Sequence, residues 1–146
     1  MRKAKINKKI GSEVAKTKDR IQALCRAIVI KRDEGCIFRD YPESGACGGI
    51  RSDGELILQF DHLNSRAYSV SYGDTRLGVC VCKRHHIFWK RQHPDEYMRI
   101  ARQHIGTKRS VLLDRVIADR KPYHMDLWDW AKVEIALIDE LEDYEV

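Results

Sequence analysis

Apolar side chains follow a helical period in the first quarter of the chain. They recur at the i, i+3, i+4, i+7 spacing of a buried helical face, at Ile21, Leu24, Cys25 and Ile28. Ser12 is a favourable residue to begin this helix and Gly35 a favourable residue to end it. We therefore expect a helix over 12–35, with Cys25 as a buried core thiol. Residues 1–11 hold several lysines and few large apolar side chains, which predicts a flexible basic arm.

Two short segments in the middle of the chain have the pattern of β-strands. In the segment 55–61, alternate positions are apolar, so one face of a strand would be buried. The segment 77–82 is rich in valine and cysteine. Residues 36–54 are rich in turn formers, and 63–76 form a polar connection. We expect the two strands to pair as a hairpin with a long loop.

The remaining third of the chain is predicted to be helical. A short helix is expected over 86–90, a second from Pro94 to Gly106, a third from Thr107 to about Arg120, and an acidic one from Asp126. The last helix has one apolar edge, formed by Trp130, Val133, Leu137 and Leu141. With 146 residues, the chain suits one α+β domain over 12–146, with a core of about 36–92 and C-terminal helices over 94–146.

The charge is distributed unevenly. The formal net charge is +5, but residues 1–20 hold eight basic and two acidic side chains, whereas 126–146 hold one basic and eight acidic ones. The basic end, which includes Lys8 and Lys9, suits a polyanion such as DNA, and the alternative is that these lysines only solvate the surface. No apolar stretch approaches the ~20 residues that cross a bilayer. We therefore expect a soluble cytoplasmic protein without a membrane partner.

Four of the five cysteines lie between residues 36 and 82, close to a pair of histidines. In a reducing compartment such clusters favour metal binding over disulfides. Cys82 and His85 have the spacing of a tight turn that holds Zn²⁺, and Cys36 with Cys47 would supply the other two ligands. Cys80 is an alternative ligand, since it is predicted to share a strand face with Cys82. The competing interpretation is that the cysteines are only buried hydrophobic residues.

A second group of residues has the chemistry of phosphodiester hydrolysis. Asp61 at the end of the first strand could hold a divalent cation, and the neighbouring His62 could take a proton from the attacking water. His86 could reach the same cation from the start of the next helix. Basic side chains flank this group and could contact phosphates: Lys83, Arg84, Lys90 and Arg91. The alternatives are a hydrogen-bonded turn at Asp61-His62 and simple solvation of the cations.

These motifs resemble those of the HNH, or ββα-metal, nucleases, in which an Asp-His pair precedes a zinc knuckle and a further metal ligand. The order of motifs along nearly the whole chain is most similar to the NinG (Rap) family of phage recombination proteins, and more distantly to the endonuclease VII type of junction resolvase. In this comparison Arg66 follows the histidine by four residues, and Asp95-Glu96-Tyr97 and Tyr123-His124 match later motifs. The chain departs from the pattern in its widely spaced Cys36 and Cys47 and in lacking the middle Asn.

The resemblance implies a zinc-stabilised ββα-metal nuclease core flanked by α-helices, in a phage-encoded enzyme that acts in the host cytoplasm. It implies cleavage of branched, Holliday-junction-type DNA with Mg²⁺ or Mn²⁺. His62 would be the general base, Arg66 would steady the phosphate, and Asp61 with His86 would hold the catalytic ion. Paired cutting would require a homodimer, for which the last helix is the candidate contact, although it could instead pack on its own domain. A less selective HNH nuclease and a non-catalytic zinc DNA-binding module are the alternatives.

Overall fold

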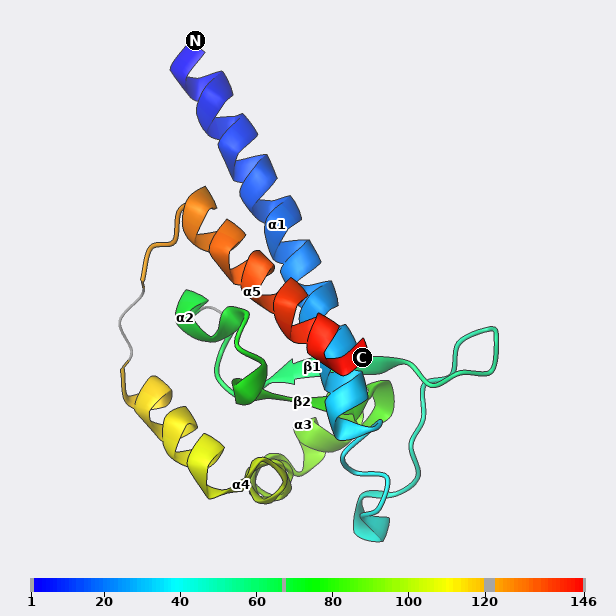
Figure 1. The fold of residues 1–146 in the computed structure, drawn as a ribbon. Coiled ribbons are helices and arrows are strands. Elements are labelled where there is room, and N and C mark those ends of the chain that lie inside the picture. The colour runs from blue at the N-terminus through cyan, green and yellow to red at the C-terminus, as the bar shows by residue number, and fades with distance from the viewer. Residues whose placement is uncertain (1, 67, 120–122, 146) are drawn as a thin grey trace.

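Helices surround a small two-stranded sheet in the computed structural model, which describes residues 2–66, 68–119 and 123–145 (Figure 1). The mixed helix and sheet content agrees with the predicted α+β class. The first helix, α1 (Arg2–Asp33), lies beside the last, α5 (Leu127–Glu145), and extends well beyond it at the N-terminal end.

Helix α1 begins earlier than the sequence pattern predicted. The segment expected as an arm before Ser12 is helical from Arg2, and its side chains are exposed. Lysine, alanine and isoleucine are compatible with a helix, and the single glycine, Gly11, costs only about 1 kcal/mol relative to alanine. The apolar stripe thus belongs to a longer helix whose first part leaves the body of the protein. Lys8 and Lys9 lie on that exposed part.

The two predicted strands pair as an antiparallel hairpin. Strand β1 (Leu58–His62) lies against β2 (Gly78–Cys82), with Leu58 opposite Cys82 and His62 opposite Gly78. The first strand starts later than expected, because the preceding residues fold back on themselves through a bridge between Ile50 and Leu56. The hairpin brings the end of β1 and the start of β2 together at one edge of the sheet.

Short helical segments occupy the connections. The long loop contains α2 (Ser69–Tyr72) and the 3-10 turn η2 (Thr75–Leu77), and another such turn, η1 (Pro42–Ser44), precedes the hairpin. After β2 come the π-helical segment η3 (His85–Trp89), α3 (Lys90–Gln92) and α4 (Pro94–Ala118). At Gly106 the backbone leaves the helical region, with φ of 82°, so α4 consists of the two predicted helices joined at that residue. Arg120, where the second was expected to end, lies outside the described residues.

The hairpin is packed between two hydrophobic clusters. One contains Val79 and Val81 and joins the sheet to Phe38, in the loop after α1, and to Tyr97 and other residues of α4. The other joins buried apolar residues of α1 and α5 to one residue of α2 and to one residue of each strand: Ile21, Cys25, Ile28, Val29, Phe60, Tyr72, Cys80, Trp130 and Leu137. This arrangement confirms that Cys25 is a buried core thiol and fixes both faces of the hairpin.

The apolar edge of α5 faces its own domain. Trp130 and Leu137 are 4% and 3% exposed, and Val133 and Leu141 pack against the same cluster. This edge cannot also form the expected dimer contact, because α1 already covers it. Asp126 begins α5 by accepting a hydrogen bond from the backbone N–H of Asp129, and its own N–H donates to the Asp129 carboxylate.

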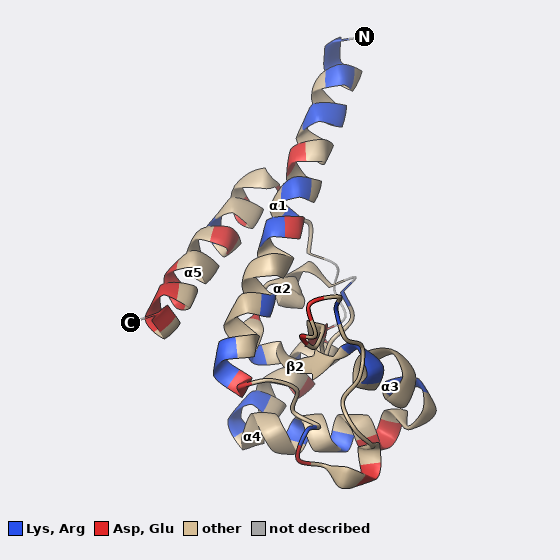
Figure 2. Cartoon of the chain, turned by 90° about the vertical axis from the view of Figure 1, so that its right-hand side faces the viewer, with Lys and Arg blue, Asp and Glu red and all other residues tan. Residues whose placement is uncertain are grey.

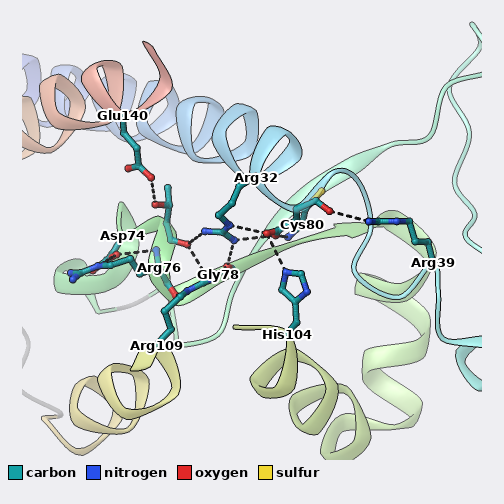
Figure 3. A network of polar contacts seen from close by, with 11 residues as sticks. Arg32, Arg39, Asp74, Arg76, Gly78, Cys80, His104, Arg109 and Glu140 are labelled. Atoms are coloured by element: carbon teal, nitrogen blue, oxygen red, sulfur yellow. Dashed lines mark hydrogen bonds and ion pairs between the residues drawn. The ribbon is translucent and has the colours of Figure 1, made fainter. Parts of the chain in front are cut away.

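Buried polar contacts hold the long loop in place (Figure 3). Arg32 of α1 and Arg109 of α4 both donate to the carbonyl oxygens of Thr75 and Gly78, at the two ends of η2. At the other end of the loop, Asn64 donates to the hydroxyl of Ser71. Side chains from the flanking helices thus hold the loop that lacks the middle Asn of the HNH pattern.

Basic and acidic side chains gather on different helices. Figure 2 shows Lys and Arg spaced along the projecting part of α1 and Asp and Glu toward the C-terminal end of α5. Where the helices run side by side, Arg20 pairs with Glu134 and Lys31 with Glu145. None of the described helices combines the length and apolar character that a membrane span requires.

Candidate metal centre and adjoining groove

Four predicted zinc ligands converge in the folded chain. The ligand atoms of Cys36, Cys47, Cys82 and His85 all lie within 4.8 Å of one another. Cys36 follows the end of α1, Cys47 lies after η1, Cys82 ends β2 and His85 begins η3. Two thiols from loops and a pair from one turn therefore surround a single point, as the spacing predicted. This is the only such group of three or more His, Cys, Asp or Glu residues within the described part of the chain.

The imidazole of His85 is oriented by contacts on both of its edges. Its Nδ1 lies 3.0 Å from the sulfur of Cys82 and 3.7 Å from that of Cys36. On the opposite edge, Nε2 lies 2.9 Å from the hydroxyl oxygen of Ser44. Phe38 stacks on the ring at a centroid distance of 5.2 Å. Ligating histidines in metal sites are held in this way through their second nitrogen.

The sulfurs are electrostatically coupled. Hydrogen bonding from the Cys36 thiol, together with the backbone N–H groups of His85 and Gly48, lowers the pKa of Cys82 to about 4 despite its burial. The same pairing with Cys82, followed by burial, raises the pKa of Cys36. A thiolate is thus favoured at Cys82, and thiolates are the form that binds metal. Three sulfurs and one imidazole form a closed set of soft donors that could hold a metal ion such as zinc.

Cys80 does not belong to this cluster, which excludes it as the alternative ligand. Its side chain is fully buried in the cluster with α1, and its backbone N–H donates to the carboxylate of Asp33. Alternation along β2 would place Cys80 and Cys82 on one face. In the structure, however, the thiol of Cys82 lies in the candidate zinc cluster, and Cys82 packs in the hydrophobic cluster that contains Cys36 and Val81.

Arg84 stabilises the loop that carries Cys47. Its guanidinium donates to the carbonyl oxygens of Ser44 and Ala46, at 2.9 and 2.8 Å. Gly48 lies against the same side chain, and a Cβ there would approach it to 3.2 Å. These bonds engage Nη1 of the guanidinium, and the contact of Arg84 with phosphate stays a prediction. This clamp explains how two widely spaced cysteines return to one centre.

A second group of polar side chains surrounds Asp61, at the end of β1. This residue is 4% exposed, and its carboxylate accepts hydrogen bonds from Lys90 Nζ at 2.9 and 2.7 Å and from the Tyr97 hydroxyl at 2.6 Å. Nε2 of His86 lies 3.1 Å from the same carboxylate. Burial alone would raise the pKa of Asp61, but His86 and Lys90 outweigh burial and lower it. Asp61 is therefore an anion with three neighbours from η3, α3 and α4.

The orientation of His86 suits a metal ligand. Its Nδ1 lies 2.6 Å from Oε1 of Gln59, which accepts the N–H of that nitrogen. The other ring nitrogen, Nε2, faces the Asp61 carboxylate at 3.1 Å. The pair thus presents one imidazole nitrogen and one carboxylate oxygen to a common point. Two protein ligands fit a divalent ion that takes its other ligands from water or phosphate.

His62 lies beside Asp61 with its side chain 8% exposed. Nε2 of its ring donates to the carbonyl oxygen of Tyr72 at 2.8 Å, so in the neutral ring Nδ1 is the proton acceptor. Burial, opposed by this hydrogen bond, lowers the pKa of His62. The ring is thus kept in the neutral form that a general base requires.

An open groove of about 780 Å³ connects these residues. Its lining includes the whole predicted catalytic set (Asp61, His62, Arg66 and His86) and Lys90. Gln22 and Arg26 of α1 line its other side, and Oε1 of Gln22 is buried with no hydrogen-bond partner among the described residues. The exposed Arg66 also lies over the ring of Tyr72, with its guanidinium carbon 5.8 Å from the ring centroid.

The other predicted DNA contacts differ in their exposure and in their partners. Lys83 and Arg91 are exposed, on either side of the segment that carries His86. Lys90 is half-buried, and its ammonium contacts the carboxylate of Asp61, whereas the sequence predicted a contact with phosphate. Three side chains orient the site residues and were missed by sequence reasoning: Ser44, Gln59 and Tyr97. They act through a histidine or a carboxylate, and no local motif marks such residues.

Comparisons of the chain with protein-family models, with curated proteins and with solved structures found no match. The interpretation of the groove therefore depends on its own residues and their geometry.

Proposed function

We propose that this chain is a metal-dependent endonuclease of the HNH type that hydrolyses DNA phosphodiesters. The observation that carries the proposal is the groove in which His62, Asp61, His86 and Arg66 meet, next to a candidate zinc cluster. A structural zinc site alone would not need a neutral, oriented histidine beside a buried carboxylate. That combination supplies a proton acceptor and an anionic ligand on adjacent residues.

Each side chain has a role that its contacts support. His62 takes the proton of the attacking water on Nδ1, while the Tyr72 carbonyl holds the opposite edge of its ring. Arg66 and Arg26 provide positive charge along the groove for the phosphate. Asp61 and His86 would hold a divalent ion such as Mg²⁺ or Mn²⁺, which would stabilise charge on the phosphate oxygens during hydrolysis. The four Cys and His ligands of the zinc cluster would hold the end of β2 and the start of η3 in position.

Branched DNA is the substrate that the distribution of cations favours. Basic side chains line the groove at Arg26, Arg66 and Lys90, and others follow the projecting part of α1 (Figure 2). A junction presents phosphates on several arms, so both places could be engaged at once. Together with the resemblance to NinG-type recombination proteins, this supports a role on Holliday-type intermediates. Paired cutting would require two copies of the chain, and the homodimer remains part of this proposal.

The decisive experiment incubates zinc-loaded protein with a four-way junction and with a linear duplex of the same sequence. Mg²⁺ or Mn²⁺ is supplied in one series, and a chelator too weak to remove zinc in the other. We expect divalent-dependent cleavage, with the junction cut faster than the duplex. Equal cleavage of both would favour a less selective HNH nuclease. Binding without cleavage under every condition would contradict the nuclease.

A non-catalytic zinc DNA-binding module is the second candidate. The specific observation in its favour is the ion pair of Lys90 with both carboxylate oxygens of Asp61, which is also what a purely structural contact would show. This candidate leaves the orientation of His62 and His86 without a use. The cleavage experiment separates the two functions.

A further inference from the structure

Lys90 lies where a cation at Asp61 would lie. Its Nζ is 2.9 Å from one carboxylate oxygen and 2.7 Å from the other. The Asp61 side chain is 5% exposed and that of Lys90 is 32% exposed. Lys90 follows His86 by one helical turn, and both side chains reach the same carboxylate. The ammonium therefore neutralises the anion from the open side of the groove.

A carboxylate this deeply buried needs a positive partner, because an uncompensated buried charge costs several kcal/mol. The Tyr97 hydroxyl is a neutral donor. His86 reaches one carboxylate oxygen at 3.1 Å, and its other nitrogen is engaged with Gln59. Lys90 contacts both carboxylate oxygens at shorter distances, so it occupies the position that a divalent ion at Asp61 would take.

We propose that Lys90 and the divalent ion compete for Asp61, and that ion binding releases the ammonium into the groove, where it contacts the substrate phosphate. This inference depends on the proposed function, since it concerns the same site. Lys90 lines the groove together with Arg66 and Arg26, so the released group stays among the cations that face DNA. Lys90 is thus a competitor of the ion at Asp61 and, once released, a contact for the phosphate.

Competition has a consequence for the order of binding. Without DNA, the ion must displace the ammonium and therefore binds weakly. A bound phosphate offers the ammonium a new partner, so DNA and the ion should each strengthen the binding of the other by the same factor. Ion binding and substrate binding would thereby be linked.

The test measures Mn²⁺ affinity in the zinc-loaded protein, from the electron paramagnetic resonance signal of free Mn²⁺. Lys90→Met should bind Mn²⁺ at least tenfold more tightly than wild type. Arg91→Met removes the same charge from an exposed neighbour and should leave the affinity unchanged. Lys90→Arg keeps a cation on the carboxylate and should resemble wild type. An unchanged or weaker affinity in Lys90→Met would overturn the proposal, as would a gain of equal size in Arg91→Met.

Lys90→Met could lose stability, because it leaves the buried carboxylate without a cation. Mn²⁺ should then raise the melting temperature of this variant more than that of wild type, since a ligand that binds only the folded state stabilises it. An equal rise in both proteins would contradict competition at Asp61.

Asp61→Asn distinguishes failure of this inference from failure of the proposed function. Removing the charged ligand should abolish Mn²⁺ binding in the groove. If Asp61→Asn abolishes binding while Lys90→Met keeps the wild-type affinity, the competition by Lys90 is wrong and the metal site stands. If wild type, Asp61→Asn and Lys90→Met all bind Mn²⁺ equally, the ion is not at Asp61 and the proposed catalytic site fails as well.

Discussion

Cys80 and Cys82 are two residues apart on β2, yet their thiols lie in different parts of the molecule. Cys82 is 3.0 Å from Nδ1 of His85 in the candidate zinc cluster, whereas Cys80 packs with Cys25 and Phe60 against α1. Both are fully buried, so exposure does not distinguish them. Their neighbours do, because Cys82 lies with Cys36, Cys47 and His85, whereas Cys80 lies in the cluster formed with α1.

This difference predicts the metal content of two matched variants. Cys82→Ala should lose bound zinc and much of its thermal stability, because a structural zinc site contributes its binding free energy to folding. Cys80→Ala should keep about one zinc per chain and lose only the packing of one thiol. Metal analysis of chelator-washed protein and thermal unfolding measure the two effects. Equal zinc content in both variants would contradict the assigned ligands.

The role of His62 predicts a variant that folds and binds DNA but cleaves slowly. His62→Ala removes the proton acceptor and leaves the zinc cluster untouched, so turnover should fall by at least about 10²-fold. His93→Ala, at an exposed position outside the groove lining, is the matched control and should cleave as wild type does. Junction cleavage under single-turnover conditions gives the rates. Wild-type cleavage by His62→Ala would remove it from the mechanism.

Much of this arrangement could be predicted from the sequence, because its signals are local. Apolar periodicity located the helices and the hairpin, and turn spacing located Cys82 and His85. The early start of α1 was not predictable in this way, since its first residues are polar and continue a helix that is stabilised further along. The ion pair between Lys90 and Asp61 could not be predicted either, because nothing in the sequence marks a lysine that pairs with a buried carboxylate.

The two tryptophans of α5 should respond very differently to substitution. Trp130 is 4% exposed and packs edge-on to Tyr72, whereas Trp128 is 77% exposed. Trp130→Ala should therefore lower the free energy of unfolding by about 3–5 kcal/mol. Trp128→Ala should change it by no more than about 0.5 kcal/mol. Urea unfolding measures both, and a similar loss in each would contradict the packing of α5 on α1.

Asp33 should link stability to pH. Burial would raise the pKa of this carboxylate, but hydrogen bonds from His104 and Arg32 outweigh burial and hold it well below its usual range. Its contribution is therefore complete above the unfolded pKa of about 3.9 and is lost as the pH falls toward the folded value. Asp33→Ala should cost roughly 3 kcal/mol at neutral pH, because it breaks a buried ion pair.

The check on Asp33 is the difference in unfolding free energy between wild type and variant across pH. That difference should be constant from neutral pH down to about 4 and should shrink below it. Asp53→Ala, which removes an exposed carboxylate, should differ from wild type by no more than about 0.5 kcal/mol. A difference for Asp33→Ala that grows on acidification would have the wrong sign for a carboxylate with a lowered pKa.

The projecting part of α1 predicts how DNA binding depends on salt. Lys8 and Lys9 are exposed there, away from the acidic α5. Each phosphate contact contributes about 0.9 to the slope of log affinity against log salt concentration. Glutamine is nearly as compatible with a helix as lysine, so Lys8→Gln/Lys9→Gln should keep α1 intact while weakening binding and flattening this slope. Lys132→Gln, on α5, should leave the slope unchanged. Fluorescence anisotropy with a labelled junction at several salt concentrations gives the slopes, and an unaltered slope in the double variant would show that this end of α1 does not contact DNA.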